Sequence, residues 1–105
     1  MLSWIVLILS GVLEAVWATA LGRSEGFSRP VPTTVFGVAL ALSMLGLAFA
    51  MRSLPTGTAY AVWVGIGASL TVLYAMVTGT EPVTLARAVF LLLIITGIVG
   101  LKVVS

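Results

Sequence analysis

The sequence contains no cysteine and no histidine, and it has only five basic and three acidic residues among 105. Without cysteine, disulfides and thiolate metal sites are excluded. Without histidine, Ser-His-Asp and Cys-His catalytic groups and histidine-bound zinc are excluded as well. The sequence offers no other nucleophile–base pair. We therefore predict that the protein is not an enzyme and holds neither a metal nor a cofactor.

Charge is scarce for a chain of this length. Charged residues make up 8% of the sequence and hydrophobic residues 61%, whereas a soluble domain carries about 25% charge. Such a chain lacks the polar side chains to cover a water-facing surface, so we predict a multi-pass protein of the cell membrane. The net charge of +2 is too small and too scattered to indicate nucleic-acid binding.

Apart from Glu14, the few charged residues cluster at breaks in the hydrophobicity that also carry glycine and proline. Each apolar stretch between breaks approaches the ~20 residues that cross a bilayer as a helix. Helices are expected rather than strands, because a closed barrel needs many alternating strands. We predict one all-α transmembrane domain over 1–105 in an up-down-up-down arrangement, with helices at about 2–22, 31–51, 57–77 and 83–102.

Glu14 is the only charged residue before Arg23. At about 1.5 Å of helix rise per residue, it lies roughly 18 Å from one end of the first span and about 11 Å from the other. An ionisable group at such depth costs several kcal/mol and usually lines a cavity, a proton relay or a binding site. The alternative is a structural carboxyl that holds a helix bundle together.

Gly11, Glu14 and Trp17 follow one another at three-residue steps, so they share one face of the first helix. The indole N–H of Trp17 lies one turn from the carboxylate, and we expect it to donate a hydrogen bond that holds Glu14 in one rotamer. We also expect Trp17 to narrow the binding chamber.

Tyr60 and Trp63 form an aromatic stripe on the third helix, and Ser43 is a lone hydroxyl in the middle of the second. A carboxylate, aromatic faces and a hydroxyl are what an organic cation needs in a dry site. The alternatives are that the two rings only pack between helices, or anchor at the membrane interface, and that Ser43 bonds its own helix backbone.

Two glycine pairs carry further expectations. Gly65 and Gly67 weaken the third helix and mark a candidate hinge. Gly97 and Gly100 allow close helix approach in the fourth span, where only residues 88–101 are uncharged. Because that stretch is shorter than the hydrocarbon core, we interpret the fourth helix as a dimerisation element.

The basic residues give almost no orientation. One side of the membrane receives Arg52 and Lys102, and the other receives Arg23, Arg29 and Arg87. Two against three is too even for the positive-inside rule to select one topology. We therefore predict that molecules insert in both orientations.

Three segments resemble the small multidrug resistance family of four-helix proton-coupled exporters: G-V-L-E-A-V-W-A at 11–18, E-G-F-S-R-P-V-P at 25–32, and P-T-G-T-A-Y-A-V-W-V-G-I-G-A at 55–68. The resemblance implies an antiparallel, dual-topology homodimer. In it, two copies of Glu14 would face one chamber and bind either protons or a small organic cation.

Trp17, the segment G-T-A-Y-A-V-W and the ending G-I-V-G-L-K resemble the guanidinium-exporting branch of that family. The resemblance therefore implies a proton-coupled exporter of guanidinium and small substituted guanidinium cations. Three alternatives stay open. In the first, the protein would be a multidrug exporter of quaternary ammonium compounds, and in the second, one half of a heterodimeric exporter. In the third, it would be a non-transporting assembly subunit in which Glu14 pairs with a basic group on another protein.

Overall fold

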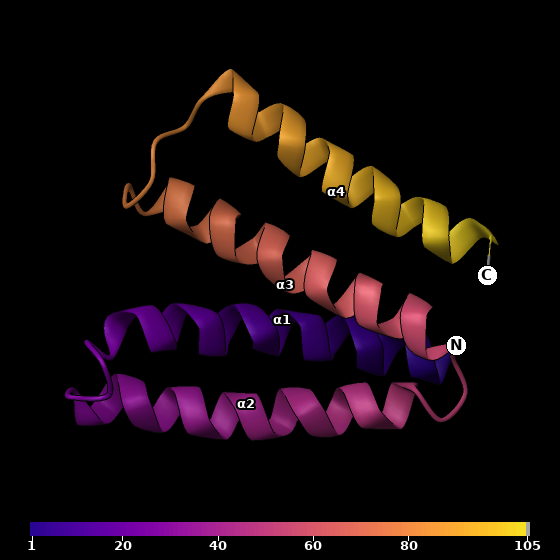
Figure 1. The fold of residues 1–105 in the computed structure, drawn as a ribbon, viewed down its shortest axis with the longest axis horizontal. Coiled ribbons are helices and arrows are strands. Elements are labelled where there is room, and N and C mark those ends of the chain that lie inside the picture. Colours follow the sequence, from indigo (N-terminus) through magenta and orange to yellow (C-terminus); the bar gives the residue numbers. More distant parts are fainter. Residues whose placement is uncertain (105) are drawn as a thin grey trace.

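The computed structural model describes residues 1–104, which form four helices: α1 (Leu2–Arg23), α2 (Pro30–Ala50), α3 (Thr56–Val77) and α4 (Leu85–Val104) (Figure 1). All four are long and apolar enough to cross a membrane, as the sequence predicted.

The ends of the helices differ by one or two residues from the prediction, and α4 differs most. It begins at Leu85 rather than at 83, because the Thr84 hydroxyl accepts a hydrogen bond from the backbone N–H of Arg87 at 3.1 Å and caps the helix. It runs to Val104, so Arg87 and Lys102 both lie within the helix. The α4 helix is therefore 20 residues long, longer than its uncharged stretch.

The α1 helix lies at the centre of the packing. It packs along α2 and crosses α3, whereas α4 packs mainly on α3 and reaches α1 near its C-terminal end, where Lys102 Nζ lies 4.8 Å from the centre of the Trp4 ring. Figure 1 shows α3 close to α1 near the N-terminal end of the chain and diverging from it toward the α3–α4 connection. The two termini lie at the same end, as an up-down-up-down chain requires (Figure 1). The core lies where α1, α2 and α3 meet, and consists of Leu7, Leu47, Ala50, Ala59, Val62 and Trp63.

Glycines allow this close packing. A Cβ added at Gly11 of α1 would lie 2.7 Å from Ile66 Cγ2 of α3, and one added at Gly46 of α2 would overlap the Ser10 side chain of α1. Membrane helices associate through such small residues because burying apolar surface gives little gain in lipid.

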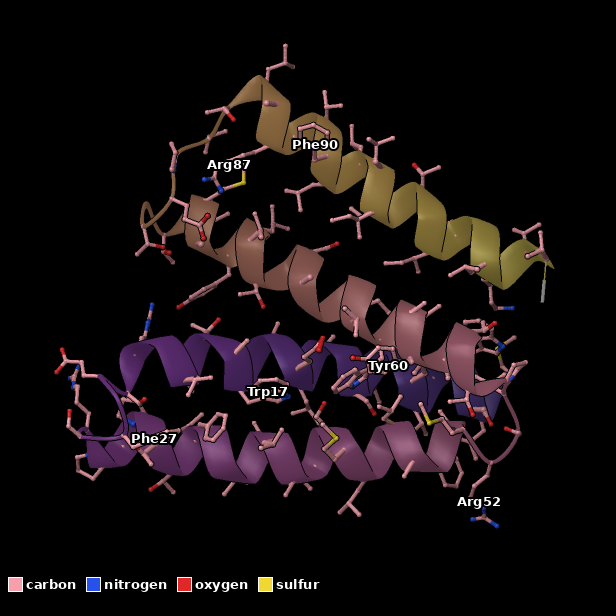
Figure 2. All side chains as sticks on the ribbon, in the orientation of Figure 1. Trp17, Phe27, Arg52, Tyr60, Arg87 and Phe90 are labelled. Atoms are coloured by element: carbon pink, nitrogen blue, oxygen red, sulfur yellow. The ribbon has the colours of Figure 1, made fainter. Side chains whose placement is uncertain are left out.

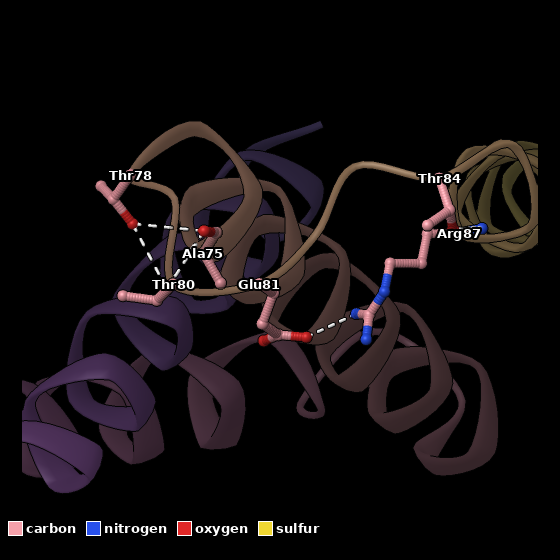
Figure 3. Close-up of polar contacts among 6 residues, drawn as sticks. All are labelled: Ala75, Thr78, Thr80, Glu81, Thr84 and Arg87. Carbon is pink, nitrogen blue, oxygen red and sulfur yellow. Dashed lines mark hydrogen bonds and ion pairs between the residues drawn. The ribbon is translucent and has the colours of Figure 1, made fainter.

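The connection between α3 and α4 is held by polar contacts (Figure 3). The hydroxyls of Thr78 and Thr80 donate to the Ala75 carbonyl at 3.3 and 3.1 Å, and Arg87 Nη1 forms an ion pair with Glu81 Oε1 at 2.5 Å. Both charged side chains are partly exposed, so the pair adds little stability but orders the start of α4.

Candidate functional site

Glu14 lies buried against α3. Only 8% of the residue is exposed, and its side chain fills the space that a side chain at Gly67 would occupy, since an added Cβ there would lie 2.7 Å from Glu14 Cγ and overlap Oε1. Within residues 1–104, Glu14 Oε1 is buried and has no hydrogen-bond partner. A buried, unpaired carboxyl oxygen is costly unless it gains a proton or a cation.

A buried hydrogen-bond network connects three helices beside this carboxyl. Trp63 Nε1 donates to Ser43 Oγ at 3.0 Å, and Ser43 Oγ donates to the Ser10 carbonyl at 2.7 Å. Ser43 is fully buried and Trp63 is 4% exposed. Ser43 therefore bonds a neighbouring helix rather than its own backbone. It fixes the indole of Trp63 relative to α1.

The aromatic rings form a continuous row. Phe27 lies 5.6 Å from Phe36 between ring centroids, and Phe36 lies 6.0 Å from Trp17 in an edge-on arrangement. Trp17 lies 6.5 Å from Trp63, which lies 5.9 Å from Tyr60. Figure 2 shows Phe27 at the α1–α2 loop, Trp17 between α1 and α2, and Tyr60 on α3. The row thus runs from the α1–α2 loop through Trp17, which is one helical turn from Glu14, to Tyr60 on α3.

Phe27 and Phe36 were missed by the sequence analysis. A signal existed for Phe36, because it precedes Ser43 by seven residues and so shares its face of the helix. No such periodicity marks Phe27, which lies in a loop with a φ of 69° beside Gly26 at 70°. This left-handed backbone turns the loop and brings the ring of Phe27 onto Phe36.

The expected hydrogen bond from Trp17 to Glu14 is absent from the described part of the chain. Trp17 Nε1 and Glu14 Oε1 are both buried without a partner, so this prediction was wrong. The reason is packing: Phe36 and Trp63 hold the Trp17 indole, whereas the carboxyl of Glu14 lies against Gly67.

The remaining predicted residues fall into different surroundings. Gly11 packs one turn from Glu14 against Ile66, and Tyr60 is 54% exposed in the single chain. Gly65 is a contact point between α3 and α4, where an added Cβ would lie 2.8 Å from Ile98 Cδ1.

Gly97 and Gly100 lie on the open side of α4, with no atom within 4 Å of an added Cβ. Along the described length of α4 no residue is buried. This apolar helix surface is accessible to lipid or to a second chain.

Comparison with known proteins agrees with this architecture. The family model described as "Small Multidrug Resistance protein" matches residues 2–94. A protein named "Guanidinium exporter" from Yersinia pseudotuberculosis is 50% identical and covers 99% of this chain and 100% of its own. A protein of the same name from Escherichia coli strain K12 is 48% identical, and the alignment covers 96% of this chain and 96% of that protein. Another from Proteus vulgaris is 42% identical, and the alignment covers 99% of this chain and 100% of that protein.

The family match spans α1, α2, α3 and the first half of α4, and the relatives align over nearly their whole length. The resemblance drawn from the sequence motifs is thereby confirmed. Together with the four membrane-spanning helices, the comparisons establish a multi-pass protein of the cell membrane. The chain belongs to the small multidrug resistance protein family.

Proposed function

We propose that this protein exports guanidinium and small substituted guanidinium cations in exchange for protons, with Glu14 as the shared binding site. The observation that carries the proposal is the buried Glu14 carboxyl in the middle of a membrane span, with Oε1 unpaired within the described residues. The relatives named "Guanidinium exporter", at 42–50% identity, support the choice of substrate.

The chemistry of the site suits a planar cation. Guanidinium presents its N–H donors in a fork that meets the two oxygens of a carboxylate. The indoles of Trp17 and Trp63 lie next to each other beside this site and offer faces for cation–π contact, which strengthens when water is excluded. A quaternary ammonium ion has no N–H donors, so it would meet the carboxylate by charge attraction alone, without the paired hydrogen bonds.

Coupling follows from the presence of one carboxyl for two ligands. A protonated Glu14 is neutral and holds no cation, whereas a cation requires the ionised form. Proton and substrate therefore exclude each other at the same group. If the site opens alternately to the two sides of the membrane, protons moving inward drive the cation outward.

The working unit in this proposal is an antiparallel homodimer. It is supported by the even distribution of basic residues, two against three, and by the open surface of α4 around Gly97 and Gly100. Topology reporters fused to the C-terminus should mark both sides of the membrane in cells that express only this chain. A single orientation would contradict the homodimer and favour a hetero-oligomer.

The central test is Glu14→Gln, which keeps the size of the side chain and removes its charge and its titration. Purified protein in liposomes should lose proton-driven guanidinium accumulation on this change. The matched control is Glu25→Gln, which alters an exposed carboxylate in the α1–α2 loop and should keep wild-type transport. Guanidinium accumulation by the Glu14→Gln variant would refute the proposal. Preferred transport of a bulky quaternary ammonium ion by the unaltered protein would refute its substrate.

A further inference from the structure

The structure contains a groove whose lining does not include Glu14. It is a groove of about 710 Å³ formed by α1, α2 and α3, within the range of about 300–1,000 Å³ typical of small-molecule sites. Most of its lining is aliphatic, from Val12 and Val16 of α1, Val35 of α2, and Leu73 and Val77 of α3. Its lining residues come from the second half of α1, the first half of α2 and the second half of α3, which is the part of the fold where α3 diverges from α1 (Figure 1).

The groove and the Glu14 site use opposite faces of α1. Val12 and Val16 lie two residues before and after Glu14, and at about 100° of rotation per residue each is turned about 160° from it. Neither Glu14 nor Trp17 lines the groove. A cation bound at Glu14 would therefore not occupy this cavity.

One end of the groove carries a positive charge. Arg23, the last residue of α1, lines it together with Tyr74. Arg23 Nη2 donates to the Tyr74 hydroxyl at 3.2 Å, and the guanidinium carbon lies 5.5 Å from the centre of the Tyr74 ring. Across residues 1–104, the one salt bridge is Arg87–Glu81, so no carboxylate of the described chain neutralises Arg23. Tyrosine holds the guanidinium in place, and donors remain for an anion.

We propose that the groove binds one anionic phospholipid, with an acyl chain along the aliphatic walls and the phosphate at Arg23. Both halves of this ligand have a counterpart: a long apolar cavity within the membrane-spanning length, and an unneutralised cation at the membrane boundary where lipid phosphates lie. A free phosphate would leave the aliphatic walls empty.

Native mass spectrometry of the purified, unlabelled protein tests this proposal, with phosphatidylglycerol and phosphatidylcholine supplied at equal concentration. We expect about five-fold stronger retention of phosphatidylglycerol, the factor equivalent to about 1 kcal/mol for one basic residue at an anionic lipid surface. Arg23→Gln should abolish this preference. Arg52→Gln, which removes an exposed arginine far from the groove, should keep it.

A second pair of variants tests the apolar walls. Thr19→Phe places a ring in the groove and should reduce the retention of both lipids, whereas Leu9→Phe adds the same ring to an exposed position of α1 outside the groove and should leave retention unchanged. The same spectra report the assembly state, and circular dichroism reports helix content, so a misfolded variant is recognised and replaced by Thr19→Leu. Equal retention by Arg23→Gln and wild type overturns the proposal. So does equal retention by the two phenylalanine variants, or retention of neither lipid by wild type.

Discussion

Replacing Gly67 with alanine tests whether α3 leaves room for the carboxyl of Glu14. The added methyl would overlap Glu14 Oε1 and lie 2.7 Å from Cγ. Because Cγ is also too close, rotation of the terminal carboxyl alone does not relieve the clash. Either the Glu14 side chain adopts another rotamer, or α3 moves away from α1.

The expected effect of Gly67→Ala on the stability of the folded protein is small, because the gain in helix propensity and the cost of overpacking oppose each other. Alanine in place of glycine favours a helix by about 1 kcal/mol, and overpacking costs about 1–3 kcal/mol. The effect on binding is larger. A hydrogen bond to a charged group contributes about 1.5–3 kcal/mol, so displacing the carboxylate from one such bond weakens guanidinium binding by roughly ten- to hundred-fold.

Guanidinium uptake into liposomes, measured over a range of concentrations, gives KM and the maximal rate separately. Gly67→Ala should raise KM with a smaller change in maximal rate. Gly57→Ala is the control, since it makes the same change in the same helix where an added Cβ meets no atom within 4 Å. An unchanged KM would refute the claim that Gly67 is needed to leave room for the Glu14 carboxyl. If only the maximal rate fell, Gly67 would act as a hinge, as the sequence suggested, and not as room for Glu14.

Two further predictions concern the aromatic row and its anchor. Trp17→Ala should weaken guanidinium transport and improve the relative transport of larger cations, since it removes a ring that contacts Phe36 and Trp63. Trp17→Phe should keep the selectivity, because the indole N–H has no partner within residues 1–104. An equal loss of transport for both kinds of cation in Trp17→Ala would contradict a role in selectivity. Ser43→Ala should destabilise the protein by about 1–2 kcal/mol in a denaturation assay, because Trp63 Nε1 loses its acceptor. The control is Ser28→Ala, which removes an exposed hydroxyl in the α1–α2 loop. Equal stability of the two variants would contradict the anchoring role of Ser43.

Much of the fold was evident from the sequence alone. A bilayer requires about 20 apolar residues per crossing, so three charged, glycine- and proline-containing breaks determined four helices to within one or two residues at their ends. Glu14 stood out for the same reason, because an acidic residue is conspicuous in a span that otherwise excludes charge. Local chemistry decided these features, and they need no knowledge of how the helices pack.

The partners of the site residues depended on tertiary structure. Ser43 bonds α1 and Trp63 rather than its own backbone, Trp17 packs on Phe36 instead of bonding Glu14, and Arg23 meets Tyr74 across the groove. In a soluble helix the apolar stripe shows which face is buried. Here lipid and protein interior are equally apolar, so the sequence leaves the rotation and crossing of the helices undetermined. Those two quantities place Glu14 against Gly67 and open the groove on the opposite face of α1.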